Sequence, residues 1–505
     1  MKRGHPVDVL LSREWGSARS AVRLRTAALH VLRFSARMGL VAILAALAAC
    51  SRKRIAQIEL DQTRPAPEWL KVPEVRNLHD YVRIDTRASQ GEQAGAEYLQ
   101  RLLDCEGIES EIVCPAPKRC NLLARLPGRR REGALLLLNH IDVEEVYPPG
   151  WKEATPFSGK LKLGYLYGRG AYDMKSLAIA QLHAMVNLKR HGILPASDLL
   201  FLGEASEEHG QEWGSRWLLD HRPDWFAGVG VVLNEGGINE LILRDVRFWG
   251  LETMQAGLAV LELQADERGR LEGLIKDFGQ RHFHDQAIAP HPQVGLGFDI
   301  LANHLSSPLT DPLRHLDRVW RDPKELEVLP DRYGAFLEPR AGWSPIFLRP
   351  AGPGGKPHAL YVVATPPGLS PAPYAKRVAD AARERGMGIW DSFVGEATSA
   401  SPYPSPFTEL LRIVTQAHYP GIPFGPVPIW GAFTTSAVFR NRGFIAYGYS
   451  PIPTNIIDQS RMHGSDERIF LRDFVNGVSL YKDVVEEWAL NPPGEQKKSA
   501  NFPSR

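Results

Sequence analysis

The sequence lacks a strong excess of charge of either sign. Its 505 residues carry a formal net charge of +2, with 60 basic and 58 acidic side chains. A near-neutral chain of this size has no electrostatic footprint for nucleic acid, so that class of partner is excluded. Hydrophobic residues make up 44% and charged residues 23%. That balance is typical of globular proteins and excludes global disorder.

Two further absences limit the kinds of fold and of catalysis that the sequence indicates. No internal repeat or long low-complexity tract is visible, and no convincing Gly-x-Ser-x-Gly elbow is present. A serine nucleophile of that type is therefore not indicated. The length exceeds what one ordinary core contains, so at least two domains are expected.

The N-terminal region contains an apolar run that is too short to cross a membrane. Residues 38–49 are apolar without interruption, whereas about 20 residues are needed to span a bilayer. Arg33 and Arg37 precede the run and Cys50 follows it, which is typical of a secretion signal over residues 1–50. A buried helix or an uncleaved anchor is the alternative. The long stretch before the run favours a translation start downstream of Met1.

The end of this region resembles the lipobox of bacterial lipoproteins. Residues 47–50 read Leu-Ala-Ala-Cys, and the resemblance implies that Cys50 is lipid-modified and becomes the first residue of the mature protein. The expected location is the periplasmic side of a bacterial cell envelope, anchored by lipid, with secretion as the alternative.

Cysteine is scarce elsewhere. If Cys50 carries lipid, Cys105, Cys114 and Cys120 remain. An odd number in an oxidising compartment allows one disulfide and leaves one thiol free. The pair Cys114–Cys120 closes the shortest loop, but buried thiols are equally compatible, and the sequence does not select the pair.

Strand and helix patterns alternate through the first half of the chain. Short apolar runs at 134–139, 198–203 and 228–233 predict buried strands, and helical spacing predicts helices over 92–108 and 175–190. This alternation predicts an α/β fold, a mostly parallel sheet sandwiched by helices.

The pattern changes after about residue 250 and returns after about 400. Segment 256–264 alternates like an antiparallel strand, periodicity is weaker over 265–358, and a strand near 359–363 precedes a helix over 372–385. Helices over 405–418 and 471–489 and a strand near 443–447 follow. The predicted organisation is a signal region 1–50, a tether 51–75, a catalytic domain in two segments (76–249 and 399–490), an inserted smaller α+β lid or dimerisation domain 250–398, and a disordered tail 491–505.

Polar motifs stand where predicted strands end or helices begin, the positions at which open α/β sheets bind ligands. His140 and Asp142 share one face of an extended segment, so an imidazole has a carboxylate beside it. Asp173 ends the stretch Gly168-Arg169-Gly170-Ala171-Tyr172-Asp173, just before a helix. Its two oxygens suit a bridge between two cations, although a helix N-cap is the plain alternative.

The remaining motifs are also acidic or imidazole-bearing. Glu207 and Glu208 are adjacent carboxylates, which are costly unless they are solvated or neutralised by a metal. An exposed acidic loop is the alternative. Glu235 ends an apolar strand, and His463 precedes the last helix.

Together these motifs resemble the zinc metallopeptidase family of aminoacylase, carboxypeptidase S, succinyl-diaminopimelate desuccinylase and carnosinase. The resemblance covers about residues 76–490 and is clearest at 135–237. It lies in the order His-x-Asp, Gly-Arg-Gly-Ala-x-Asp-Met-Lys, Glu-Glu, strand-end Glu and late His-Gly.

The resemblance implies two zinc ions per chain, with cobalt or manganese as substitutes. It implies these roles: Asp173 bridges both ions, His140 and Glu235 hold one, Glu208 and His463 hold the other, Asp142 supports His140, and Glu207 is the general base. The expected reaction is hydrolysis of an amide bond in an N-acyl amino acid, a dipeptide or a C-terminal residue. A homodimer is the possible assembly.

The match has departures on the substrate side. The Gly-His-x-Ser-type motif of relatives is not found, and His282, His284 and His291 lack its context. Thr435 stands where relatives tend to have Asp, and Asn234 stands where some relatives have Asp. These departures leave an unusual substrate, a different oligomer or reduced activity open. The rival function is a zinc-dependent peptide-binding lipoprotein without turnover.

Overall fold

The computed structural model describes residues 61–237, 239–242, 245–278, 280–282, 288–304, 310–327, 329, 331–343, 356–427 and 433–493. The predicted signal region with Cys50 and most of the predicted tail lie outside these ranges. The chain divides into a unit of residues 1–64 and a unit of residues 65–505. Among the described helices, none has both the length and the apolar character that crossing a bilayer requires.

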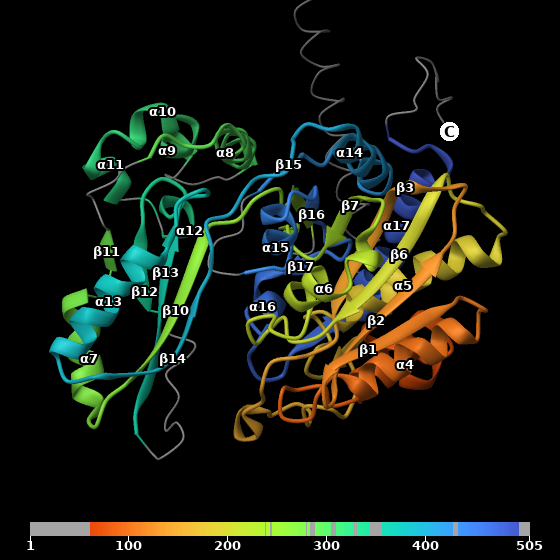
Figure 1. The fold of residues 1–505 in the computed structure, drawn as a ribbon, viewed down its shortest axis with the longest axis horizontal. Coiled ribbons are helices and arrows are strands. Elements are labelled where there is room, and N and C mark those ends of the chain that lie inside the picture. The colour runs from red at the N-terminus through yellow and green to blue at the C-terminus, as the bar shows by residue number, and fades with distance from the viewer. Residues whose placement is uncertain are drawn as a thin grey trace, which may run out of the picture. The chain divides into compact units, whose positions relative to one another are not determined.

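The main sheet has six strands in the order β1-β2-β6-β3-β7-β16 (Figure 1). Their bounds are β1 Ser110–Ala116, β2 Arg119–Leu126, β3 Arg130–His140, β6 Ser197–Glu204, β7 Val229–Asn234 and β16 Ala446–Gly448. Strands β6, β3, β7 and β16 are parallel, while β2 runs antiparallel to both of its neighbours. The prediction of a mostly parallel sheet is confirmed.

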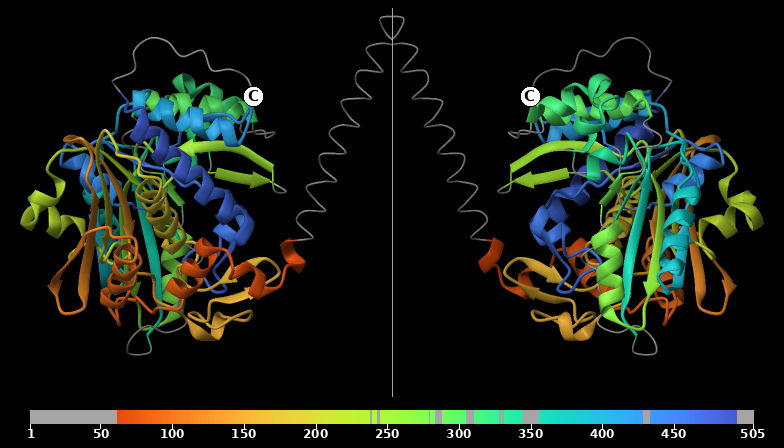
Figure 2. Two further views of the ribbon diagram at one scale, coloured as in Figure 1. Left: turned by 90° about the vertical axis from the view of Figure 1, so that its right-hand side faces the viewer. Right: turned by 90° about the vertical axis from the view of Figure 1, so that its left-hand side faces the viewer.

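Helices cover both faces of this sheet (Figures 1 and 2), because its strands are apolar on both sides. Leu135 and Leu137 of β3 belong to one core, and Leu136 and Leu138 belong to another, as the alternation of a strand requires. The first core includes residues of α3 Pro73–Val82, α4 Gln93–Asp104, α5 Lys175–Arg190, α14 Pro406–His418 and α17 Leu471–Leu490. The second includes α6 Ser215–His221, the 3-10 helix η2 Pro223–Phe226 and α15 Ser436–Asn441.

Two small sheets connect distant parts of the chain. One has the order β18-β5-β4, with bounds β18 Arg468–Phe470, β5 Tyr165–Tyr167 and β4 Lys160–Lys162. The other has the order β15-β9-β8-β17, with bounds β15 Phe424–Pro426, β9 Asp245–Leu251, β8 Asn239–Ile242 and β17 Thr454–Asn455. Both sheets join residues before 252 to residues after 423.

A five-stranded antiparallel sheet lies inside the segment 250–398. Its order is β11-β12-β13-β10-β14, with bounds β11 Gln280–His282, β12 Arg340–Trp343, β13 His358–Thr365, β10 Gly257–Gln264 and β14 Gly388–Val394. Helices α7 Arg268–Phe278 and α13 Ala372–Glu384 share a core with it. Between β11 and β12 lie α8 Pro292–His304, α9 Thr310–Arg314, α10 Leu316–Val319, α11 Pro323–Glu327 and α12 Asp331–Gly334.

Three predicted details need adjustment. The predicted tether 51–75 reaches into packed structure, because α2 Ala66–Trp69 and the start of α3 bury Trp69 and Val75 in the main core. The predicted helix 92–108 ends at Asp104. The strand near 443–447 begins only at Ala446, after a turn in which Gly443 has a φ of 86°.

Cys114 and Cys120 form a disulfide, and Cys105 is a free, exposed thiol. The bond joins the neighbouring strands β1 and β2 across their turn, at the edge of the main sheet. Of the alternatives that the sequence left open, the structure has the shortest loop.

His183 on α5 makes stability depend on pH. Its Nε2 lies 3.1 Å from Asn77 Nδ2 on α3, and burial lowers the pKa of His183 to about 4. Since the unfolded pKa is about 6.5, the folded state favours the neutral ring. Stability is therefore full above about pH 6.5 and falls as the pH drops towards 4.

We expect this histidine to account for about 2 kcal/mol of lost unfolding free energy between pH 7 and pH 5. Urea unfolding of the metal-free wild type and of His183→Gln at both pH values measures it. The variant should lose about 2 kcal/mol less than the wild type over this range. Equal losses in the two proteins would contradict the assignment.

Candidate metal centre

Three parallel strands deliver acidic and imidazole side chains to one edge of the main sheet. His140 is the last residue of β3, Glu207 and Glu208 follow β6, and Glu235 follows β7. Because β3 pairs in parallel with both β6 and β7, their carboxyl ends meet at the same edge. This is the edge at which open α/β sheets bind ligands.

The pairing of β18 with β5 delivers the other two residues. The strands are antiparallel, with Arg468 opposite Tyr167, so the residues before β18 lie beside the residues after β5. Gly168 N donates to Glu467 O over 2.9 Å and extends this pairing. His463 and Asp173 thereby meet, with His463 Nε2 2.9 Å from Asp173 Oδ2.

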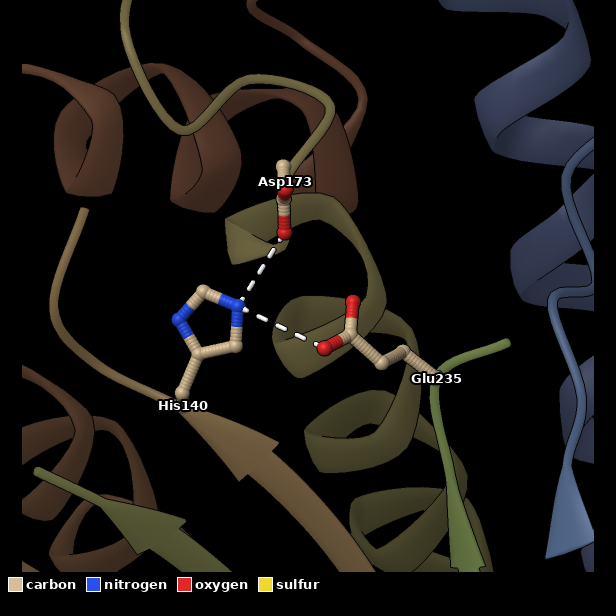
Figure 3. A group of neighbouring side chains, drawn as sticks. All are labelled: His140, Asp173 and Glu235. Atoms are coloured by element: carbon tan, nitrogen blue, oxygen red, sulfur yellow. Dashed lines mark hydrogen bonds and ion pairs between the residues drawn. The ribbon is translucent and has the colours of Figure 1, made fainter. Parts of the chain in front are cut away.

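His140, Asp173 and Glu235 form a first group with metal-binding chemistry (Figure 3). His140 Nε2 lies 3.1 Å from Asp173 Oδ1 and 3.7 Å from Glu235 Oε1. His140 Nδ1 lies 2.9 Å from the carbonyl oxygen of Asp142. A carbonyl only accepts, so Nδ1 carries a proton, and Nε2 is the ring nitrogen that faces the carboxylates of the site.

His463, Glu208 and Glu144 form a second group, in which the ligand atoms lie within 4.8 Å of one another. His463 Nε2 is 3.2 Å from Glu208 Oε2. Since His463 and His140 each approach a different oxygen of Asp173, this carboxylate stands between the two groups. The five residues predicted as metal ligands are therefore all brought together.

Asp142 holds the loop after β6 rather than the imidazole of His140. Its Oδ1 accepts from Glu207 N and its Oδ2 accepts from Glu208 N, each over 3.0 Å. The nearest approach of its carboxylate to His140 Nδ1 is 3.7 Å, and its own backbone carbonyl makes the hydrogen bond to the ring. The sequence places Asp142 next to His140, but the side-chain contact is with the glutamate loop.

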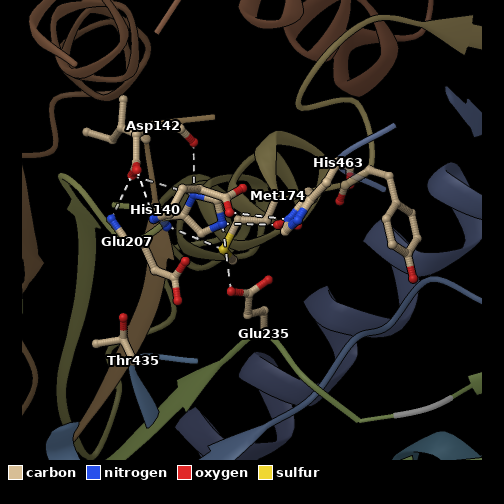
Figure 4. Close-up of polar contacts among 12 residues, drawn as sticks. His140, Asp142, Met174, Glu207, Glu235, Thr435 and His463 are labelled. Carbon is tan, nitrogen blue, oxygen red and sulfur yellow. Dashed lines mark hydrogen bonds and ion pairs between the residues drawn. The ribbon is translucent and has the colours of Figure 1, made fainter. Parts of the chain in front are cut away.

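Glu207 is buried among the other carboxylates (Figure 4). Its Oε1 has no hydrogen-bond partner among the described residues. Burial raises the pKa of Glu207 well above its usual value, and the carboxylates of Glu235 and Glu208 raise it further against the opposing effect of His140. A carboxylate with a raised pKa and a free oxygen is suited to accepting a proton.

The neighbouring ionisable groups respond to the same crowding. Burial opposes ionisation of Asp173, but hydrogen bonds from both histidines outweigh it and the pKa falls far below its usual value. Burial and repulsion by Asp173 raise the pKa of Glu235 to about 8. Burial also raises the pKa of Glu208.

This arrangement fits divalent cations. The donors are imidazole nitrogens and carboxylate oxygens, which zinc accepts. Glu207 Oε1 and Glu208 Oε1 are buried and without hydrogen-bond partners among the described residues. Burial is the main cause of the raised pKa values of the glutamates, and the negative charge of neighbouring carboxylates, which the two histidines do not balance, adds to it. A cation in each group would supply that balance.

A buried ion pair fixes the loops that carry Asp173 and His463. Arg169 Nη1 donates to Glu467 Oε2 over 2.5 Å, with side chains 3% and 0% exposed. Glu467 Oε1 accepts from the backbone N–H groups of Tyr172 and Asp173, and Arg169 Nη2 donates to the backbone oxygen of His463. The pair thus ties both loops to each other. Glu467 was not anticipated from the sequence.

Thr435 and Asn234, the two residues that differ from the family motifs, form hydrogen bonds within the protein. Thr435 Oγ1 accepts from Gln211 Nε2 over 2.7 Å. Burial raises the pKa of Glu204, and hydrogen bonds from Ser215 and Thr435 oppose that rise. Asn234 Nδ2 donates to Ser436 Oγ. The amide of Asn234 therefore joins the end of β7 to the start of α15.

The described histidines His291 and His358 contact residues of the same inserted segment. His291 Nδ1 accepts from Gln293 N at the start of α8. His282 ends β11, and His284 lies outside the described residues. His358 contacts Glu262 with one ring nitrogen and Gln264 with the other.

The chain belongs to peptidase family M20/M25/M40, whose family model matches residues 136–487. This confirms the resemblance seen in the motifs, the fold class and the prediction of a metallopeptidase-type enzyme.

Curated relatives are similar over about a quarter to a third of the chain. A probable succinyl-diaminopimelate desuccinylase of Staphylococcus aureus (strain Mu50) is 32% identical over 146 residues, which are 29% of this chain and 36% of that protein. A succinyl-diaminopimelate desuccinylase of Wolinella succinogenes is 38% identical over 128 residues, 25% of this chain and 32% of that protein. The chain thus matches about a third of the length of these relatives.

Solved structures share the fold over most of the chain. An M20 family metallo-carboxypeptidase from Sulfolobus solfataricus has a TM-score of 0.61 at 15% identity, covering 83% of this chain and 99% of that one. Human carnosine dipeptidase 1 has a TM-score of 0.60 at 15% identity, covering 84% and 98%. At this identity the likeness shows the fold alone.

Replacing Glu467 with Ala should lower the unfolding free energy by about 3–5 kcal/mol, because Arg169 would remain buried without its counterion. Urea unfolding in the presence of a chelator measures this without a contribution from bound metal. As a control, Glu409→Ala breaks the exposed Arg412–Glu409 pair and should cost less than about 1 kcal/mol. Similar losses for the two variants would contradict a structural role for the Arg169–Glu467 pair.

Proposed function

We propose that the chain is a two-zinc amidohydrolase that cleaves an N-acyl amino acid, a dipeptide or a C-terminal residue. The observation that carries the proposal is the arrangement around Asp173, whose two oxygens each approach a different histidine. The first ion would be held by His140, Asp173 and Glu235, and the second by Asp173, Glu208 and His463. Cobalt or manganese would be accepted by the same donors.

Bound zinc ions would lower the pKa of a water molecule and withdraw electrons from the amide carbonyl. The chain itself moves the proton. Glu207 Oε1 accepts a proton from the attacking water as the water oxygen bonds to the carbonyl carbon. When the carbon–nitrogen bond breaks, Glu207 returns that proton to the leaving amine. Asp142 keeps Glu207 in place through the backbone of its loop.

The substrate class is supported by what the similar proteins are named for. They are named a succinyl-diaminopimelate desuccinylase, a metallo-carboxypeptidase and a carnosine dipeptidase. The rival function of peptide binding without turnover has no support from these comparisons. A buried Glu207 with a free oxygen is useful for proton transfer and not for binding alone.

Substituting Glu207→Gln should reduce the rate on N-acyl amino acids and dipeptides by about 10²–10⁴-fold, because the amide cannot take the proton. Zinc content should stay at the wild-type value, since Glu207 is not a proposed ligand. Steady-state assays across a panel of both substrate types, with metal analysis of each preparation, measure the two quantities.

Glu212→Gln provides the matched control, because Glu212 is an exposed carboxylate on the same loop. It should leave the rate unchanged. The hydrolase proposal is overturned if the wild type turns over every substrate no faster than Glu207→Gln does, and saturable binding of peptides without cleavage would then favour the rival.

We also propose a lipid anchor on Cys50 at the periplasmic side of a bacterial envelope, which rests on the apolar run and the lipobox-like residues before it. Cys50→Ser should move the protein from the membrane fraction to the soluble fraction of an expressing bacterium. Equal membrane association of both forms would refute the anchor.

A homodimer built on the inserted segment 250–398 is also part of the proposal, and sedimentation analysis of the purified protein tests it.

A further inference from the structure

Glu144 lies at the metal centre, although no sequence motif predicted it there. Its carboxylate lies within 4.8 Å of ligand atoms of both Glu208 and His463. It follows Asp142 by two residues, and Asp142 follows His140 by two. Residues at this spacing in an extended segment share a face, which explains how a residue beyond the end of β3 faces the same site.

A second observation indicates that this group is built for a cation. The side chain of Glu208 is 6% exposed, and its Oε2 contacts His463. Its other oxygen, Oε1, is buried and has no hydrogen-bond partner among the described residues. A buried carboxylate oxygen without a donor is costly unless an ion occupies that side.

Glu144 is itself not neutralised by the protein. Among the described residues no Lys or Arg side chain pairs with it, and its Oε2 accepts only from the backbone of Glu145, over 3.2 Å. The next carboxylate in the chain differs. Glu145 lies 3.3 Å from Arg87 and accepts from Ser89 N, so it has partners of its own.

We propose that Glu144 is an additional ligand for the ion held by Glu208 and His463. The proposal rests on the two-ion centre described above and extends it. With Asp173, this ion has four protein donors, whereas the ion held by His140, Asp173 and Glu235 has three. Zinc sites with four protein donors are closed, and sites with three keep a position for water or substrate. The two ions are therefore unequal, and the His463 ion is held more tightly.

Zinc titration of the metal-free protein tests the inequality. The wild type should bind two zinc ions in two separable steps, and Glu144→Gln should weaken one step at least tenfold while leaving the other unchanged. Glu145→Gln is the matched control, because it removes the same charge one residue away, and it should bind zinc as the wild type does. Cobalt(II) gives an independent readout, since loss of a ligand changes its visible absorption in Glu144→Gln alone.

The outcomes separate this proposal from the proposed function. A wild type that binds no zinc would overturn the two-ion centre itself. A wild type that binds two ions, with titration and cobalt spectra unchanged in Glu144→Gln, would overturn only the role of Glu144. Equal weakening by Glu144→Gln and Glu145→Gln would also overturn it, because the effect would then come from overall charge. An altered KM for substrates with a free amine, without a change in zinc affinity, would assign Glu144 to substrate binding instead.

Discussion

The concentration of carboxylates around two imidazoles is the constraint on which the rest of the site depends. Asp142, Asp173, Glu207, Glu208 and Glu235 all lie within reach of His140 or His463. Placing so many acidic groups in a buried place raises the pKa of the glutamates and costs folding free energy. Bound cations would offset this loss of folding free energy, so metal binding would stabilise the fold.

Strand pairing and hydrogen bonds hold the acidic side chains in place despite this cost. Parallel strands β3, β6 and β7 end at one edge, and the short β5–β18 pairing adds two loops from distant parts of the chain. Asp142 binds the backbone of the glutamate loop, and Glu467 binds the backbone before Asp173. Acidic side chains thus hold the backbone of the loops that carry other acidic side chains. Each support fixes a ligand's position without entering the proposed chemistry.

The sequence predicted the elements whose pattern is strong. The helix predicted over 175–190 is observed with the same bounds, and the three buried strands differ from their predictions by a few residues at most. The β1–β2 hairpin was not predicted because it is an edge hairpin with a mixed burial pattern. The helices between β11 and β12 are mostly short, so helical periodicity is weak there.

The residues of the site could likewise be predicted where the motifs are clear, and were missed elsewhere. The motif order was enough to place His140, Asp173, Glu208, Glu235 and His463 in one centre. Glu467 and Glu144 were missed, although the i, i+2, i+4 spacing of His140, Asp142 and Glu144 was readable. The contact of Asp142 with the glutamate loop depends on how β3 pairs with β6. The spacing of residues along one strand does not predict that pairing.

Crystals grown with zinc and measured at the zinc absorption edge would test the central claim most directly. The account predicts two anomalous peaks, one among His140, Asp173 and Glu235 and one among Asp173, Glu208 and His463, with Asp173 contacting both. A single peak, or peaks away from Asp173, would contradict it.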